Sequence, residues 1–254
     1  MTPEQVLAAA GAWVWYPPEA RVVETDDYLL IAYPAHFSDP TVATRWQSDR
    51  PADELIDEVL DAAHGLGRES VNFFELSEAT RPPDLEPRLR ARGAVRTETL
   101  AVLALDLSAG VPDLDVPADL ELRRVLDLDD LRATDGIDVA AFGGSLADET
   151  ALASTASRLA EEPRYVALRA GVPVGTAGHT IQSGAVRLWG GAVVPEARHT
   201  GVYRGLLDVR LRAGVEAGVA MALVKGRVET SAPVLLRAGF RQYGEVRAYR
   251  LGRA

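Results

Sequence analysis

One stretch in the second half of the chain has residue types and spacing suited to binding a phosphorylated ligand. It covers residues 188–207 and reads LWGGAVVPEARHTGVYRGLL. An apolar, strand-like run ends at Pro195, a short loop turns at Gly201, and an amphipathic helix begins at once. The first amides of such a helix have no acceptor within it, and the helix dipole adds positive charge there. We therefore expect a pyrophosphate-sized anion site at this junction.

Three residues favour the same interpretation. Arg198 and Arg204 place positive charge on both sides of the turn. Gly201 has no Cβ, which we expect to leave room where phosphate oxygens approach the backbone. The amides that we expect to be free run from about His199 to Arg204.

The elements around this motif are predicted from hydrophobic periodicity and from turn residues. A three-strand meander followed by a strand–helix–strand crossover predicts an α/β fold with a mixed, mostly antiparallel sheet flanked by helices. Gly190 and Gly191, inside a strand, indicate a bulge or a close backbone approach. The predicted strands cover 120–125, 165–169, 173–182, 186–194 and 220–228, the helices 127–142, 146–162, 201–217 and 232–237, and a closing hairpin 241–251.

The first half of the chain repeats the end of this plan. Residues 89–94 (LRARGA) align with residues 235–240 (LLRAGF) at an offset of 146. A helix over 52–64 and a strand over 71–76 precede the first of these segments, in the order seen in the second half. Gly110, Pro112 and Pro117 break regular structure between the halves. We therefore predict two similar lobes, formed by residues 1–112 and 118–254.

The loop motif resembles that of a known superfamily. Residues 198–203 (RHTGVY), after a strand that ends at Val193, Val194 and Pro195, resemble the [QR]-x-x-G-x-[GA] loop of the GNAT acyl-CoA N-acyltransferases. Residues 235–240 resemble the short closing helix and Gly-Phe of that superfamily. The resemblance covers the whole second half, and the first half resembles the degenerate copy of tandem members.

The resemblance implies a function and a site. The chain would be an N-acetyltransferase that moves an acetyl group from acetyl-CoA to an amine of a small molecule or peptide. Backbone groups of Val193 and Val194 would bind the pantetheine arm. Main-chain amides would cradle the pyrophosphate, and they belong to Arg198, His199, Thr200, Gly201, Val202, Tyr203 and Arg204. The alternatives are a non-catalytic acyl-CoA-binding sensor or scaffold, and a structural pairing domain that binds neither ligand.

Two departures from the family pattern bear on the chemistry. Tyr203 stands where the loop motif has Gly or Ala, so its ring either narrows the cofactor groove or points sideways. Leu235 stands where many members carry a Tyr that protonates the leaving thiolate. The remaining acid or base candidates each have an equally plain structural interpretation, so the catalytic residues stay unknown; these candidates are His179, Glu229, Tyr243 and Tyr249.

Composition narrows the class of protein further. The chain has no Cys, and its four His have no metal-ligand spacing, so we expect neither disulfides nor a metal site. Residues 1–112 carry 19 acidic residues and 9 Arg, a net charge of −10, whereas residues 113–254 carry 18 of each sign. This balance disfavours nucleic acid as a partner. No long apolar run or leader is present, so we expect a cytoplasmic protein. We also expect it to be bacterial, and to be a monomer or homodimer. The WVWYPP cluster at residues 13–18 is expected to lie in the core of the first half.

Overall fold

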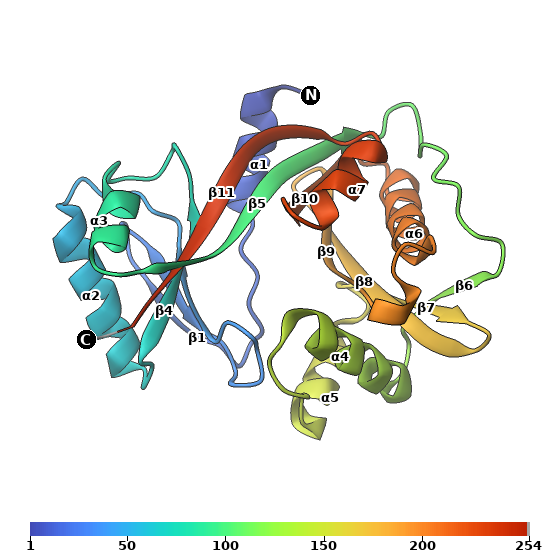
Figure 1. Ribbon diagram of the computed structural model, residues 1–254, viewed down its shortest axis with the longest axis horizontal. Helices are drawn as coiled ribbons and strands as arrows, with labels where there is room; N and C mark the ends of the chain where they lie inside the picture. Colours follow the sequence, from blue (N-terminus) through green and yellow to red (C-terminus); the bar gives the residue numbers. More distant parts are fainter. Residues whose placement is uncertain (253–254) are drawn as a thin grey trace.

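A computed structural model of the protein describes residues 1–252, which form one large β-sheet with helices around it. The sheet has eleven strands in the order β1-β2-β3-β4-β11-β5-β10-β9-β8-β7-β6. Neighbouring strands are antiparallel except for two parallel pairs, β3 with β4 and β9 with β10. This confirms the predicted α/β fold with a mixed, mostly antiparallel sheet (Figure 1).

The first half of the chain supplies one end of the sheet. The predicted helix and strand are both observed, as α2 and β4. The helix α3 is followed by the long strand β5. The elements are α1 (Pro3–Ala12), β1 (Arg21–Glu24), β2 (Leu29–Ala32), β3 (Thr41–Thr44), α2 (Ala52–Gly65), β4 (Ser70–Leu76), α3 (Leu85–Ala91) and β5 (Val95–Asp106).

The second half supplies the other end, and its elements follow the predicted order. Asp127 and Asp148 cap α4 and α5, since their side chains accept from the amides of Asp130 and Ala151. The elements are β6 (Leu120–Arg124), α4 (Leu128–Phe142), α5 (Glu149–Arg158), β7 (Arg164–Arg169), β8 (Val172–Gln182), β9 (Ala185–Val193), the 3₁₀ turn η1 (Pro195–Ala197), α6 (Val202–Glu216), β10 (Met221–Arg227), α7 (Ser231–Arg237) and β11 (Arg241–Gly252).

The two halves exchange their last strands. β5 of the first half pairs with β10 of the second, and β11 of the second half pairs with β4 of the first. β5 and β11 also pair with each other, so these two long strands cross the middle of the molecule side by side (Figure 1). The predicted hairpin over 241–251 is therefore wrong. The segment is one continuous strand because its partners come from the first half, and no local turn is needed.

The internal repeat is visible in the element bounds. A shift of 146 residues carries Leu85–Ala91 (α3) onto Ser231–Arg237 (α7), and Val95–Asp106 (β5) onto Arg241–Gly252 (β11). Each of these pairs has equal length, so the short sequence match at 89–94 and 235–240 extends over a helix and a long strand. The structure thus supports two similar halves, and the exact division at 1–112 and 118–254 stays a prediction.

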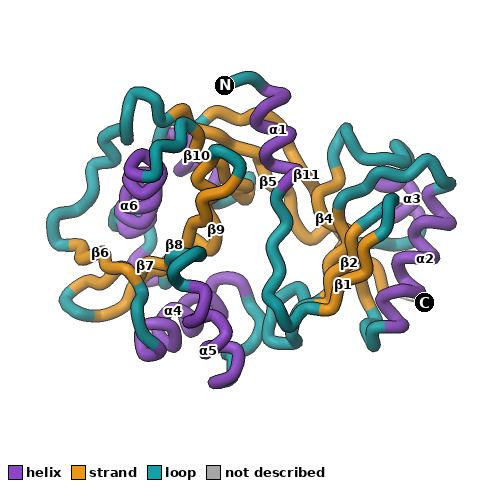
Figure 2. Tube along the Cα trace, turned by 180° about the vertical axis from the view of Figure 1, so that it is seen from behind, coloured by secondary structure: helices purple, strands orange, loops and turns teal. Residues whose placement is uncertain are grey.

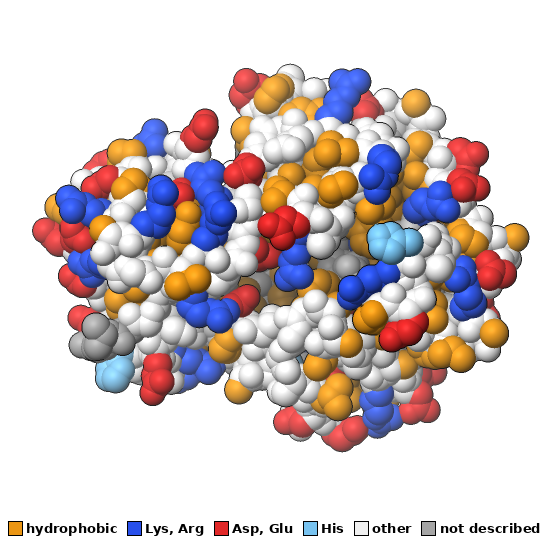
Figure 3. Space-filling model, in the orientation of Figure 1, with side chains coloured by type: hydrophobic (Ala, Val, Ile, Leu, Met, Phe, Trp, Pro, Cys, Tyr) orange, Lys and Arg blue, Asp and Glu red, His pale blue; other side chains and the backbone are white. Residues whose placement is uncertain are grey.

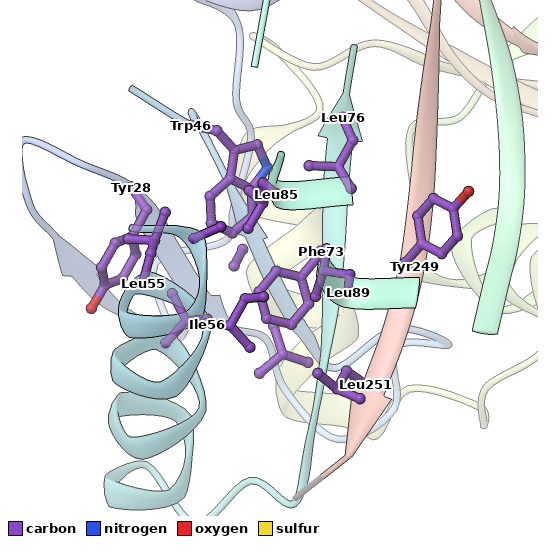
Figure 4. Close-up of a cluster of buried hydrophobic side chains, with 14 of the residues drawn as sticks. Tyr28, Trp46, Leu55, Ile56, Phe73, Leu76, Leu85, Leu89, Tyr249 and Leu251 are labelled. Atoms are coloured by element: carbon purple, nitrogen blue, oxygen red, sulfur yellow. The ribbon is translucent and has the colours of Figure 1, made fainter. Parts of the chain in front are cut away.

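Each half has its own hydrophobic core, and each core includes a strand from the other half. Figure 4 shows the first core, where Phe73 and Trp46 stack at 5.4 Å and Tyr249 and Leu251 of β11 join them. The second core gathers residues of β9, β10, α6 and α7 around Ala101 and Leu103 of β5. Removing either long strand would therefore expose apolar surface in both halves.

Helices cover both faces of the second half of the sheet. On β7, Val166 and Leu168 pack in a cluster with residues of α4 and α5, whereas Ala167 between them packs against α6. Successive strand residues point to opposite faces, so α4 and α5 lie on one face and α6 on the other, as Figure 2 also shows from behind. None of the helices in residues 1–252 is long and apolar enough to span a bilayer.

The strand exchange predicts that neither half folds alone. Residues 113–254 without β5 would leave β10 and β11 without their shared neighbour. We expect residues 1–112 and 113–254, expressed separately, to show no cooperative unfolding in urea, and co-expression to restore it. A monomeric fragment with a cooperative transition of its own would contradict this.

Candidate active site

The parallel strands β9 and β10 part from one another inside the second half. Their pairing is confined to Ala185–Arg187 against Met221–Leu223, and none is found beyond it in the described part of the chain. Just past this point, Gly190 and Gly191 form the predicted bulge, since both lie opposite Ala177 between the paired residues of β8 and β9. Gly190 has a φ of 59°, which favours glycine. The sheet is therefore open between the end of β9 and β10.

The backbone at the end of β9 faces this opening. The Val194 amide donates to the Val174 carbonyl on β8 at 3.0 Å. Because outward and inward pairs alternate along an antiparallel ladder, the backbone groups of Val193 turn away from β8. The Val193 carbonyl accepts from Arg198 Nε at 3.3 Å. The Val193 amide points to the same side, toward the opening.

The chain then turns tightly into α6. Pro195 begins the 3₁₀ turn η1, and His199 and Gly201 both have left-handed backbone, with φ of 63° and 88°. The first helical hydrogen bond runs from the Gly205 amide to the Gly201 carbonyl, at 3.1 Å. Among residues 1–252, we find no acceptor for the amides of residues 199–204. Six consecutive free amides at a helix N-terminus form a site for an anion.

The two predicted arginines differ in availability. Arg198 is exposed and bonds only a backbone carbonyl. Arg204 Nη1 lies 3.0 Å from Oδ2 of Asp115, which belongs to the segment that joins the two halves. A carboxylate thus sits beside the free amides and shares the charge of Arg204.

Gly201 has another role than the one expected from sequence. A Cβ on this residue would lie 2.4 Å from Cγ of Pro117, not in open space before the amides. A glycine is required at position 201 because the backbone there is left-handed and because Pro117, in the segment that joins the two halves, leaves no room for a Cβ. We expected a glycine here because phosphate oxygens need the room. That reason is wrong, since a Cβ would point at Pro117 and not at the free amides.

Tyr203 does not cross the anion site. Its Cε2 lies 3.1 Å from the position that a Cβ on Gly191 would take, so the ring packs under the β9 bulge. Burial raises the pKa of the Tyr203 hydroxyl, although the neighbouring Arg210 guanidinium opposes the shift. Of the two orientations considered from sequence, the structure has the one that leaves the loop open.

The acid and base candidates found from sequence lie away from the opening. His179 is buried under α6, stacked 5.7 Å from Tyr165, and burial together with Arg210 and Arg124 lowers its pKa to about 4. Glu229 is exposed in the turn after β10. Tyr243 packs near α1, and the Tyr249 hydroxyl donates to Glu86 Oε1 at 2.9 Å in the first half.

Two adjoining cavities between the halves were not found from sequence. One, of about 510 Å³, lies between the α4–α5 region and residues 34–38, and it is walled by Trp13, Trp15 and Trp189. The other, of about 420 Å³, reaches the point where β9 and β10 part. The expectation that residues 13–18 lie in the first core is wrong, because Trp13 and Trp15 are half-buried and line both cavities.

The second cavity holds charged side chains from both halves. Its lining includes Leu188, Gly190 and Val224 of the parting strands, together with Glu75 of β4 and Lys225 of β10. Figure 3 shows a hollow where the halves meet, bordered by charged side chains of both signs. Lys225 was visible in the sequence as the chain's single lysine, but only the fold brings Glu75 to it.

The start of α2, the counterpart of α6 in the first half, is less suited to an anion. At the start of α2, the amides of Gln47 and Ser48 donate to backbone carbonyls, and that of Arg50 donates to a serine hydroxyl. Pro51 has no amide hydrogen, and Asp53 and Glu54 place negative charge in the first turn. The acidic first turn therefore distinguishes α2 from its counterpart α6, whose first turn has no acidic residue.

Comparisons with known proteins match the structure and not the sequence. No protein-family model and no curated protein matches the chain. A GCN5-related N-acetyltransferase from Kribbella flavida has a TM-score of 0.64 at 17% identity, over 100% of this chain and 96% of that one. One from Sphaerobacter thermophilus has a TM-score of 0.66 at 17% identity, over 98% and 85%. A tandem GNAT protein from the clavulanic acid biosynthesis pathway has a TM-score of 0.57 at 17% identity, over 96% and 86%.

These neighbours define the class of fold. The chain has the mixed, helix-flanked sheet of the GNAT acyl-CoA N-acyltransferases, as the loop motif at residues 198–203 led us to expect. The likeness extends over both halves, and a tandem member is among the neighbours.

The Asp115–Arg204 contact predicts an effect on the binding of an anionic ligand, with acetyl-CoA as the probe. We expect Asp115→Asn to strengthen binding about two- to fivefold, because it frees a guanidinium and removes a carboxylate from the anion site. Isothermal titration at low salt measures this. Glu216→Gln is the control, since it makes the same charge change at the far end of the 15-residue α6. Unchanged or weaker binding in Asp115→Asn would show that Arg204 does not face the ligand.

Proposed function

We propose that this protein is an acyl-CoA-dependent N-acyltransferase that uses acetyl-CoA and acetylates an amine of a small molecule or peptide. The observation that carries the proposal is the opening between β9 and β10 beside six free amides at the start of α6. The fold of the neighbours named N-acetyltransferases supports it.

The residues present suit acetyl-CoA. Its pyrophosphate carries the charge that free amides at a helix N-terminus accept, and these amides belong to residues 199–204 next to the exposed Arg198. The outward amide of Val193 is available to the pantetheine arm. Acetyl-CoA would supply the activated acyl group, and a thioester bound past these amides would reach the cavity lined by Gly190 and Val224.

The aromatic-walled cavity of about 510 Å³ is the proposed acceptor site. Its volume is in the range of sites for small organic ligands. It meets the second cavity at Trp13, Trp15 and Trp189, so an amine bound there can approach the thioester past these side chains. These walls favour an acceptor with an apolar or aromatic body.

The alternative, a non-catalytic acyl-CoA sensor or scaffold, is less well supported because acceptor-sized cavities adjoin the cofactor opening. We further propose that the protein acts in the cytoplasm, as a monomer or homodimer, without nucleic acid or membrane partners.

Titration and turnover test the proposal together. We expect acetyl-CoA to bind, and Arg198→Ala to weaken binding about tenfold by removing an exposed cation from the anion site. Arg212→Ala is the control, since Arg212 lies ten residues after the start of α6 and pairs with Asp208. We also expect free thiol release with at least one primary amine in a screen. Binding without release for any amine would favour the sensor, and no binding would reject both functions.

A further inference from the structure

Lys225 is the only lysine in a chain with 26 arginines. It lies on β10, just beyond the last residue of that strand that pairs with β9. Its side chain is 16% exposed, lines the second cavity and contacts Oε1 of Glu75. An ammonium group therefore stands where the thioester is proposed to lie.

Glu75 comes from the first half and is held in place by its backbone. The pairing of β4 with β11 shifts between Phe73 and Leu76, so Glu75 lies in a bulge, and its φ is 62°. A bulge redirects a side chain that regular alternation would place elsewhere. The carboxylate is 14% exposed, and its Oε2 accepts from Thr44 Oγ1 at 3.3 Å.

The other charged groups around this cavity bond to partners outside the pair, although Arg187 also lies in the electrostatic field of Glu75. Arg187 of β9 donates to the Ala9 carbonyl at 2.7 Å, and the Tyr33 hydroxyl donates to the Trp15 carbonyl at 2.7 Å. The remaining carboxylates pair with surface arginines, Asp39 with Arg250 and Glu98 with Arg227. Glu75 and Lys225 are thus the two oppositely charged groups of the cavity that bridge β4 and β10.

The identity of the cation carries chemical information. A guanidinium forms ion pairs at least as well as an ammonium, but it does not release a proton in proteins. Everywhere else, this chain forms its cationic contacts with arginine. Of the two cations that line this cavity, Arg187 and Lys225, the lysine is the one that permits proton transfer.

We propose that Glu75 and Lys225 are the proton-transfer pair of the acyl transfer, an inference that rests on the proposed function. Glu75 takes a proton from the acceptor's ammonium, and the freed amine nitrogen forms a bond to the thioester carbon. As the carbon–sulfur bond breaks, Lys225 gives a proton to the leaving thiolate and recovers one from protonated Glu75. The second proton of the former amine goes to water. The products are the amide, the free thiol and one proton, so the pair ends as it began.

This assignment replaces the acid that Leu235 cannot provide. Leu235 is fully buried, and its Cδ1 lies 3.0 Å from the position that a Cβ on Gly226 would take. The leucine side chain therefore packs against β10 at the position where the family pattern has a tyrosine. The assignment also gives the first half a catalytic group.

The test compares charge-conserving and charge-removing variants. The probes are acetyl-CoA with tyramine, tryptamine, spermidine and trialanine, and the readouts are thiol release and titration with acetyl-CoA. We expect Glu75→Gln and Lys225→Arg each to lower kcat at least 100-fold, the scale of general acid–base catalysis. Acetyl-CoA affinity should stay within threefold of the wild type. Glu86→Gln is the matched control, because Glu86 also links the halves, through Arg247, and lines neither cavity.

The outcomes separate the inference from the proposed function. If Lys225→Arg restores the activity that Lys225→Met loses, the lysine is only a charge partner and the proton-transfer role is overturned. If the wild type and Glu75→Gln release thiol at equal rates, the pair is likewise rejected while the proposed function stands. A wild type that releases no thiol with any amine would overturn both.

Discussion

The pairing of β5 with β11 holds the molecule together, and the rest of the structure depends on it. These strands each carry one half of the chain into the other, so both cores contain residues from both halves. Backbone hydrogen bonds fix the register of the exchange, and a slip by one residue would turn each inward side chain outward. The halves therefore have one defined position, and Glu75 meets Lys225 across the cavity only because of it.

The two halves share a fold but not a site. In the second half, two left-handed residues, His199 and Gly201, lead into α6 and leave its first amides free. At the start of α2, Pro51 has no amide hydrogen, and Asp53 and Glu54 repel an anion. The first half instead contributes aromatic and carboxylate side chains to the cavities. Under the proposed function, the second half binds the cofactor, and both halves line the acceptor cavity.

Local signals made much of this structure predictable. Turn residues and helical periodicity gave the order of elements from β6 to α7, and the glycine pair at 190–191 indicated the bulge in β9. The run of free amides follows from the strand–proline–glycine–helix sequence alone. Features that depend on distant partners were missed. The sequence of residues 241–251 suggests a hairpin because the strand's true partner, β5, lies far away in the chain. Trp13 and Trp15 look like core residues because a sequence shows that a side chain is apolar, but not whether it packs in a core or lines a cavity.

The central claim is that one helix start, at residues 199–204, receives the cofactor. Hydrogen–deuterium exchange with and without acetyl-CoA tests it most directly, because those amides have no acceptor within the described chain. The account predicts fast exchange there in the free protein, marked protection on binding, and no change at residues 47–54 before and in α2. Protection at α2, or none at residues 199–204 under saturating acetyl-CoA, would contradict it.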